Sequence, residues 1–247
     1  MGESLNITKI IEFNGVPGIG KTTIALNLFN ELQVRNIQVC YFSEYYSSLK
    51  KNKYLLLKAI LKIRIIQIQF LLNSFYVMRY KNIFKQTRRI MSAFKHFLLM
   101  NYCYETQKYH CIIMDQGLIQ SWISYFHSSK IQETNSFKEL FKKVANHYAE
   151  YYIVNTHLEK DIIVERLCNR EFGTSRLDKL HEQEKLKVVE VQIINFELIR
   201  NAISSDKAKY IDTSKTINFN VKEIIEFVVN QHQGKIDENE WNYKKYI

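Results

Sequence analysis

The residues with the clearest chemical potential form one short run near the N-terminus. They are Gly15, Val16, Pro17, Gly18, Ile19, Gly20, Lys21, Thr22 and Thr23. The first eight match the pattern G-x-x-x-x-G-K-[ST], in which backbone N–H groups wrap a phosphate. In that pattern the lysine reaches the β- and γ-phosphates, and the hydroxyl that follows it is a ligand for Mg²⁺. The run therefore predicts a binding site for a nucleoside triphosphate and Mg²⁺.

Glycine usage supports this prediction. The chain has only seven glycines and one proline in 247 residues, and three of those glycines and the proline stand between positions 15 and 20. Glycine is needed where a backbone turns tightly or approaches a ligand closely. The run also follows an apolar segment, Lys9–Phe13, and opens an amphipathic one, Thr22–Leu32. This context favours a functional loop over an accidental match.

A second candidate is Asp115, which ends the apolar run His110–Met114. In phosphate-loop folds, an acid at the carboxyl end of a neighbouring strand holds Mg²⁺ directly or through water. Gly117 follows two residues later and lets the chain turn away. A strand that ends in a turn-forming aspartate is the alternative interpretation. Because the phosphate-binding run lies upstream, we predict that Thr22 and Asp115 form the Mg²⁺ site.

Three arginines in the second half of the chain could bind a phosphoryl group. Arg166 and Arg170 are four residues apart, so they share one face of a helix. Arg176 follows Gly173, on an expected turn. Guanidinium groups on a closing lid would stabilise charge on a transferring phosphate, and the lid would exclude water. The alternative is an ordinary solvated helix face with nearby glutamates as ion-pair partners.

Alternating strands and helices must position these candidates. Apolar runs typical of strands lie at Lys9–Phe13, Ile37–Phe42, Cys111–Met114, Tyr151–Val154 and Lys209–Ile211. Helix-length segments separate them, at Lys21–Arg35, Leu49–Tyr109, Ile119–His147, Leu158–Ser204 and Val221–Gln231. Near-continuous apolar strands alternating with helices are typical of a parallel sheet covered on both faces. The pattern predicts a single domain over residues 1–247, of three α/β/α layers with a five-stranded parallel sheet.

Four further motifs accompany the loop: Val39–Glu44, Asp115–Ser121, Glu165–Arg170 with Ser175–Asp178, and Tyr210–Ser214. Spread between Lys9 and about Val229, they resemble the P-loop nucleoside and nucleotide kinase group, and thymidylate-kinase-like proteins most closely. The resemblance implies a P-loop NTPase fold with a helical insertion between strands two and three, at about 49–110, and a lid at about 160–178. It also implies that ATP donates its γ-phosphate to a small-molecule acceptor. The implied catalytic residues are Lys21, Glu44, Asp115, Arg166, Arg170 and Arg176.

One position departs from this resemblance. These kinases carry an arginine after the acid of the third strand, where this chain has Gln116. That arginine helps to hold a phosphate on the acceptor, so its loss favours a neutral acceptor such as a nucleoside or sugar hydroxyl. Glu44 would then orient or deprotonate the hydroxyl, and a surface acid at the end of a strand is its alternative interpretation.

Charge is concentrated in one segment. Residues 49–110 contain thirteen Lys or Arg and one acid, Glu105, so the segment carries +12 while the whole chain carries +10. Three interpretations remain open: a helical subdomain over the acceptor site with a solvated basic face, docking of residues 50–108 on an anionic membrane surface, and contact with nucleic acid or another polyanion. The segment has no recognised nucleic-acid-binding motif, which disfavours the third.

The remaining features bound the class of protein. The four cysteines form no CxxC pair, no histidine spacing is typical of a metal site, and no secretory pattern begins the chain. We therefore expect a cytoplasmic protein, with the membrane surface as an alternative location, and a homodimer is compatible with the sequence. The leading functional hypothesis is a small-molecule kinase. The alternatives are a nucleotide-binding regulatory ATPase and a membrane-associated kinase of a sugar or lipid-linked precursor.

Overall fold

The computed structural model describes residues 8–50, 53–78, 83–123, 126, 130–131, 134–169, 177, 180–200 and 206–230. Within these residues the strands are β1 (Lys9–Asn14), β2 (Val39–Tyr41), β3 (Cys111–Met114), β4 (Tyr151–His157) and β5 (Ala208–Asp212). Every neighbouring pair is parallel, and the order across the sheet is β2-β3-β1-β4-β5. The predicted five-stranded parallel sheet is confirmed, with β1 at its centre.

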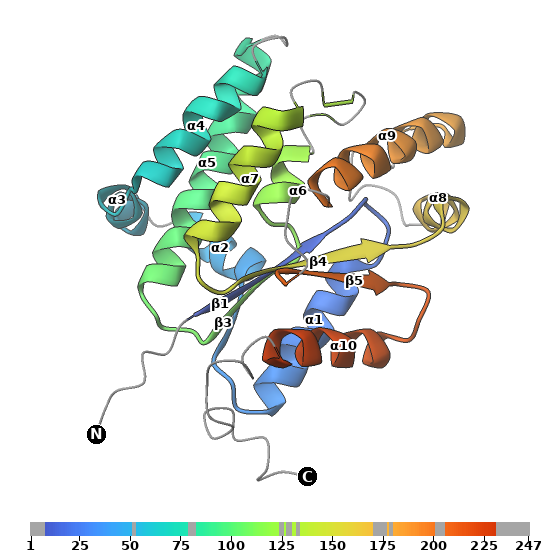
Figure 1. Ribbon diagram of the computed structural model, residues 1–247, viewed down its shortest axis with the longest axis horizontal. Coiled ribbons are helices and arrows are strands. Elements are labelled where there is room, and N and C mark those ends of the chain that lie inside the picture. Colours follow the sequence, from blue (N-terminus) through green and yellow to red (C-terminus); the bar gives the residue numbers. More distant parts are fainter. Residues whose placement is uncertain are drawn as a thin grey trace.

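Helices cover both faces of the sheet (Figure 1). Helices α1 (Lys21–Val34) and α10 (Ile217–Asn230) lie on one face. The other face carries α2 (Phe42–Lys50), α5 (Ile83–Glu105), α6 (Leu118–Ile123), α7 (Thr134–His147), α8 (Lys160–Cys168) and α9 (Glu182–Arg200). Two more helices, α3 (Lys53–Leu61) and α4 (Ile65–Met78), pack against α5. The predicted three-layer α/β/α fold is confirmed.

The central strand, β1, contributes side chains to two hydrophobic cores, one on each face of the sheet. Successive residues of a strand point to opposite faces. In β1, Ile10 packs into the core that includes α5 to α9, whereas Ile11 and Phe13 pack against α1 and α10. All six residues of β1 are buried. Burial on both faces favours apolar side chains on either side of the strand, as at Ile10, Ile11 and Phe13.

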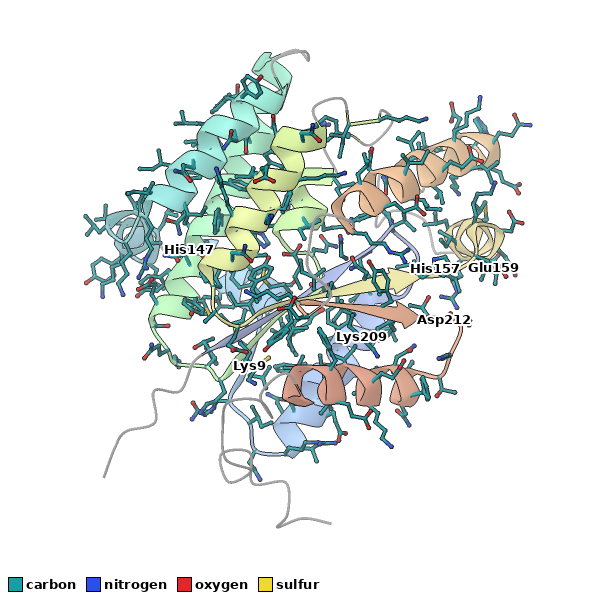
Figure 2. All side chains as sticks on the ribbon, in the orientation of Figure 1. Lys9, His147, His157, Glu159, Lys209 and Asp212 are labelled. Atoms are coloured by element: carbon teal, nitrogen blue, oxygen red, sulfur yellow. The ribbon has the colours of Figure 1, made fainter. Side chains whose placement is uncertain are left out.

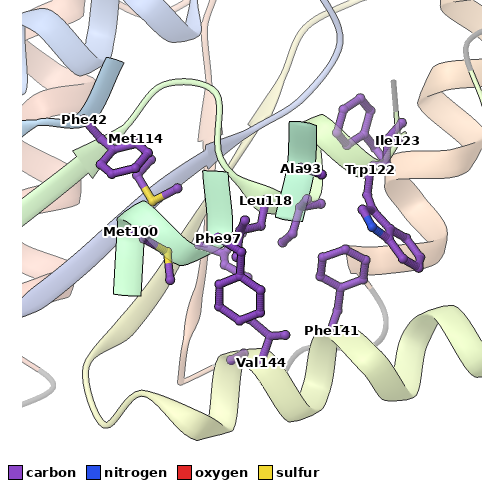
Figure 3. Close-up of a cluster of buried hydrophobic side chains, with 14 of the residues drawn as sticks. Phe42, Ala93, Phe97, Met100, Met114, Leu118, Trp122, Ile123, Phe141 and Val144 are labelled. Atoms are coloured by element: carbon purple, nitrogen blue, oxygen red, sulfur yellow. The ribbon is translucent and has the colours of Figure 1, made fainter. Parts of the chain in front are cut away.

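The larger core is rich in aromatic side chains (Figure 3). The ring centroid of Trp122 in α6 lies 5.4 Å from that of Phe70 and 5.5 Å from that of Phe141. Its indole N–H donates to Ser74 Oγ at 3.0 Å, so the polar atom of the ring is paired inside the core. Trp122 thereby joins α4, α6 and α7 into one packed unit.

Each of the longer helix-length segments contains more than one helix. The helical insertion expected between the second and third strands comprises α3, α4 and α5 within the described residues, and α2 precedes them from Phe42. Between α3 and α4 the backbone N–H of Arg64 donates to Gln67 Oε1 at 2.5 Å, a capping arrangement that starts a new helix. Among the described residues, the helix-length segment at 119–147 contains α6 and α7, and the one at 158–204 contains α8 and α9.

Candidate functional site

Residues 15–20 connect β1 to α1 at the carboxyl end of the central strand. Gly15, Gly18 and Gly20 have φ angles of 148°, 85° and 103°. Residues with a Cβ are strained at such angles, whereas glycine is not. The loop therefore needs glycine at these three positions to curl round the start of α1.

Close neighbours hold the loop on two sides. A Cβ on Gly15 would lie 2.2 Å from Thr156 Oγ1, at the end of β4. A Cβ on Gly18 would lie 2.9 Å from the side chain of Leu167 in α8. The Thr156 hydroxyl also donates to the carbonyl oxygen of Asn14 at 2.8 Å. Helix α8, which is part of the predicted lid, thus packs directly on the phosphate-binding loop.

Lys21, the first residue of α1, is buried against the loop. Its ammonium group donates to the carbonyl oxygens of Gly15 at 2.7 Å and of Val16 at 2.9 Å. These contacts hold the charge beside the N-terminus of α1, where backbone N–H groups and the helix dipole favour an anion. Gly20 caps this helix and has no side chain that could accept from those N–H groups. Positive charge and donors are therefore concentrated where a phosphate would bind.

Asp115 lies beside the loop because β3 pairs directly with β1. Its Oδ2 accepts a hydrogen bond from Thr22 Oγ1 at 3.0 Å. Its Oδ1 accepts one from the hydroxyl of Ser43. The structure therefore brings Thr22 and Asp115, the two predicted metal ligands, into contact at the start of α1.

The residues at this point fit a Mg²⁺ ion that binds together with a nucleotide. Mg²⁺ prefers oxygen ligands and keeps several waters, so one hydroxyl, one carboxylate and the substrate phosphates can hold it. In the part of the chain that the structure describes, no group of three or more His, Cys, Asp or Glu side chains could hold a metal ion.

The structure corrects the expected position of Glu44. This residue is expected at the end of the second strand, but α2 begins at Phe42, and Glu44 lies exposed in the first helical turn. Ser43, one residue earlier, is the residue that contacts Asp115. A serine after a strand is ordinary in sequences, so no local signal distinguishes Ser43 as a site residue.

Of the three predicted lid arginines, the structure describes Arg166. Its guanidinium donates to the carbonyl oxygen of Ile19 at 3.4 Å. Its Nη1 would lie 3.7 Å from a Cβ on Gly20. Arg166 therefore reaches the phosphate-binding loop from α8. Arg170 and Arg176 lie outside the described residues.

Aromatic and imidazole side chains gather near Asp115 on α2 and α5. The ring of His96 contacts those of Phe42 and Tyr46, with centroid distances of 4.8 and 5.1 Å. Burial lowers the pKa of His96 to about 4, so the imidazole is neutral at physiological pH. Burial and the nearby carboxylate of Asp115 raise the pKa of Tyr41 above its ordinary value, so its phenol stays protonated. Both titratable groups are therefore neutral here.

Glu12 in β1 is a buried carboxyl group beneath α6. Its Oε1 accepts from the backbone N–H of Ile119 at 2.7 Å, and its Oε2 accepts from the hydroxyl of Tyr151. A Cβ on Gly117 would lie 2.0 Å from Glu12 Cδ, so this turn also requires glycine. Burial raises the pKa of Glu12 to about 7, although its hydrogen bonds oppose the shift. Glu12 thus fixes the turn after Asp115, and an acid inside an apolar strand is the signal that identifies it.

Comparison with known proteins yields a likeness at low identity. No protein-family model matches the chain, and no curated protein matches it in sequence. Among solved structures, deoxyadenosine kinase from M. mycoides with bound dATP is similar over 88% of this chain and 97% of that chain, with 13% identity and a TM-score of 0.48. Because the identity and the score are this low, we infer function from this chain's own residues.

Proposed function

We propose that this protein is an ATP·Mg²⁺-dependent phosphotransferase of the nucleoside and nucleotide kinase type, which acts on a small-molecule hydroxyl. The observation that carries the proposal is the contact between Thr22 and Asp115, 3.0 Å apart beside the phosphate-binding loop. A loop hydroxyl and a strand-end acid serve together where Mg²⁺ accompanies a nucleotide. ATP is the donor substrate, and a Mg²⁺ ion held by these two residues would neutralise charge on its phosphates.

Lys21 and Arg166 are the cations proposed to bind the transferring phosphate. Lys21 would exchange its contacts with the loop carbonyls for phosphate oxygens, while Arg166 approaches from α8. Phosphoryl transfer spreads negative charge over the γ-oxygens, and donors that are already in place stabilise that charge best. Arg170 and Arg176 are proposed to join them from the same predicted lid.

The acceptor is proposed to bind between α2, α5 and Asp115. Ser43 bonds Asp115 there, and Glu44 lies exposed one residue further along α2. An acceptor hydroxyl held there would pass its proton to Glu44 as its oxygen attacks the γ-phosphate, and ADP would leave. The neutral His96 nearby, and Gln116 in place of an arginine, favour an uncharged acceptor such as a nucleoside or sugar. In this proposal the thymidylate-kinase-like resemblance extends to the reaction and not to a monophosphate acceptor.

The test is a transfer assay with γ-labelled ATP, Mg²⁺ and separate pools of nucleosides, nucleoside monophosphates and sugars. The wild-type protein should label one pool, and Lys21→Ala should slow that transfer at least about a hundredfold. Thr22→Val should raise the Mg²⁺ concentration needed for half-maximal transfer. Lys222→Gln, at an exposed lysine of α10, is the matched control and should retain full activity.

Two outcomes would contradict the proposal. Transfer by Lys21→Ala at the wild-type rate would remove the phosphate-binding loop from the reaction. Label that appears only as inorganic phosphate, at a rate that no small molecule increases, would instead identify a regulatory ATPase.

A further inference from the structure

The outward side of α3 and α4 is apolar, where a surface helix normally carries polar side chains. Leu61 of α3 is 77% exposed, and Ile65 and Leu72 of α4 are 74% and 63% exposed. Helix α4 contains no charged residue at all. No helix in the described part of the chain has the length and hydropathy that a membrane crossing requires. We call the following set the apolar face: Tyr54, Leu57, Ile60, Leu61, Ile65, Ile68, Leu72, Phe75 and Tyr76.

The spacing of the exposed residues of α4 places them on one side of that helix. In α4 the exposed positions 65, 68, 72, 75 and 76 recur every three or four residues, so they share one side of the helix. The opposite side, which includes Phe70, is buried in the core. An exposed apolar surface on this scale is typical of an interaction site.

Positive charge accompanies the apolar face. Lys58 in α3 and Lys62 just after it are exposed. The one acid between residues 49 and 110, Glu105, forms an ion pair with Arg64. Long basic side chains can lay their methylene groups on apolar surface while their charges reach polar surroundings. The segment that carries the apolar face thus has a strong charge of one sign.

A basic groove adjoins the apolar face. It has a volume of about 850 Å³ and lies between the start of α4 and α7. Ile65 lines the groove and also belongs to the apolar face, so the two surfaces are continuous. His147, labelled in Figure 2 at the end of α7, lines it as well. The charged residues of the groove are Arg64, Lys142, Lys143 and Glu139.

We propose that the apolar face and the basic groove dock this protein on an anionic lipid surface. The apolar side chains would enter the interfacial region, while the groove binds phosphate headgroups. Charge complementarity favours lipid over a second copy of the chain. Two copies that met through this face would bring two segments of charge +12 together, which Coulomb repulsion opposes.

The proposal is tested by co-sedimentation with phosphatidylcholine vesicles, with and without phosphatidylserine. The full chain should bind the anionic vesicles, and added salt should weaken this binding. Ile65→Gln combined with Leu72→Gln should weaken partitioning at least about tenfold, because two apolar side chains leave the interface. Lys142→Gln combined with Lys143→Gln should weaken it about fivefold for each lysine, the equivalent of about 1 kcal/mol each.

Matched controls come from the opposite side of the sheet. Val34→Gln on α1, where valine is 79% exposed, and Lys222→Gln on α10 should bind vesicles as the wild type does. Absence of wild-type binding, equal binding to neutral vesicles, or unchanged binding by the apolar-face variant would each overturn the proposal. Light scattering adds a further check. A wild-type dimer that the apolar-face variant converts to a monomer would identify a second copy as the occupant and would likewise overturn it.

Discussion

The buried carboxyl group of Glu12 should make the free energy of unfolding depend on pH. Burial raises its pKa from 4.5, the value of an exposed glutamate, to about 7. Between these two values the folded chain keeps a proton that the unfolded chain has lost, so rising pH favours unfolding. The stabilising contribution is fully present below pH 4.5 and is lost as the pH rises through about 7.

The size of the effect follows from the shift. Each pKa unit corresponds to about 1.36 kcal/mol. A displacement from 4.5 to about 7 therefore lowers the free energy of unfolding by about 3 kcal/mol across that interval. The hydrogen bonds from Tyr151 and Ile119 favour the ionised form, so they already reduce this figure. A loss of that size is a large part of the roughly 5–15 kcal/mol that stabilises a folded protein.

Glu12→Gln isolates this contribution. The amide has the shape of the carboxyl group and still offers an oxygen to the backbone N–H of Ile119, but it does not titrate. Urea unfolding followed by circular dichroism at a series of pH values gives the free energy of each protein. The free energy of unfolding of the variant, relative to that of the wild type, should rise by about 3 kcal/mol between pH 4.5 and about 7. Glu197→Gln, at an exposed position of α9, is the control and should run parallel to the wild type.

Two outcomes of this pH series would contradict the prediction for Glu12. If the free energies of wild type and Glu12→Gln change in parallel across the whole pH range, the carboxyl group does not experience the buried environment described. If the free energy of unfolding falls more steeply with rising pH in the variant than in the wild type, the pKa of Glu12 is lowered on folding and not raised.

Two further substitutions test the packing near this carboxyl and in the aromatic core. Gly117→Ala would place a Cβ 2.0 Å from Glu12 Cδ, and both oxygens of that carboxyl group are held by hydrogen bonds. We therefore expect the free energy of unfolding in urea to fall by about 3 kcal/mol. A fall below about 1 kcal/mol would show that Glu12 moves aside freely. Trp122→Phe removes the donor to Ser74 Oγ and part of a buried ring, so we expect a loss of about 2–3 kcal/mol by the same measurement. Wild-type stability in that variant would show that the indole N–H is not paired as described.

The phosphate-binding loop and Asp115 could be placed from sequence because their signals are local. The loop is a pattern of eight consecutive residues, and its three constrained glycines all fall within it. Asp115 follows from one additional rule, since the carboxyl ends of parallel strands meet at one edge of the sheet. Knowing where the strand ends is therefore enough to place Asp115 beside the loop, where it contacts Thr22.

Ser43 and Glu12 could not be placed in the same way, because their contacts join distant parts of the chain. Ser43 is 72 residues from Asp115, and Glu12 is 139 residues from Tyr151. Alternation along a strand predicts the face of a side chain but not its partner, which depends on strand order and register. Glu44 illustrates the same limit, because α2 begins at Phe42, whose ring is buried in the core.

A buried acid that lowers stability at neutral pH needs a structural reason, and the contacts of Glu12 supply one. Glu12 accepts hydrogen bonds from the N-terminus of α6, where the helix dipole favours negative charge, and from Tyr151 in β4. An apolar residue in its place would leave an N–H group and a hydroxyl unpaired in the core, at about 1–3 kcal/mol each. Together these costs, about 2–6 kcal/mol, are comparable with the roughly 3 kcal/mol by which the buried acid lowers stability as the pH rises to about 7. The acid therefore fixes the turn between β3 and α6, and Asp115 is the first residue of this turn.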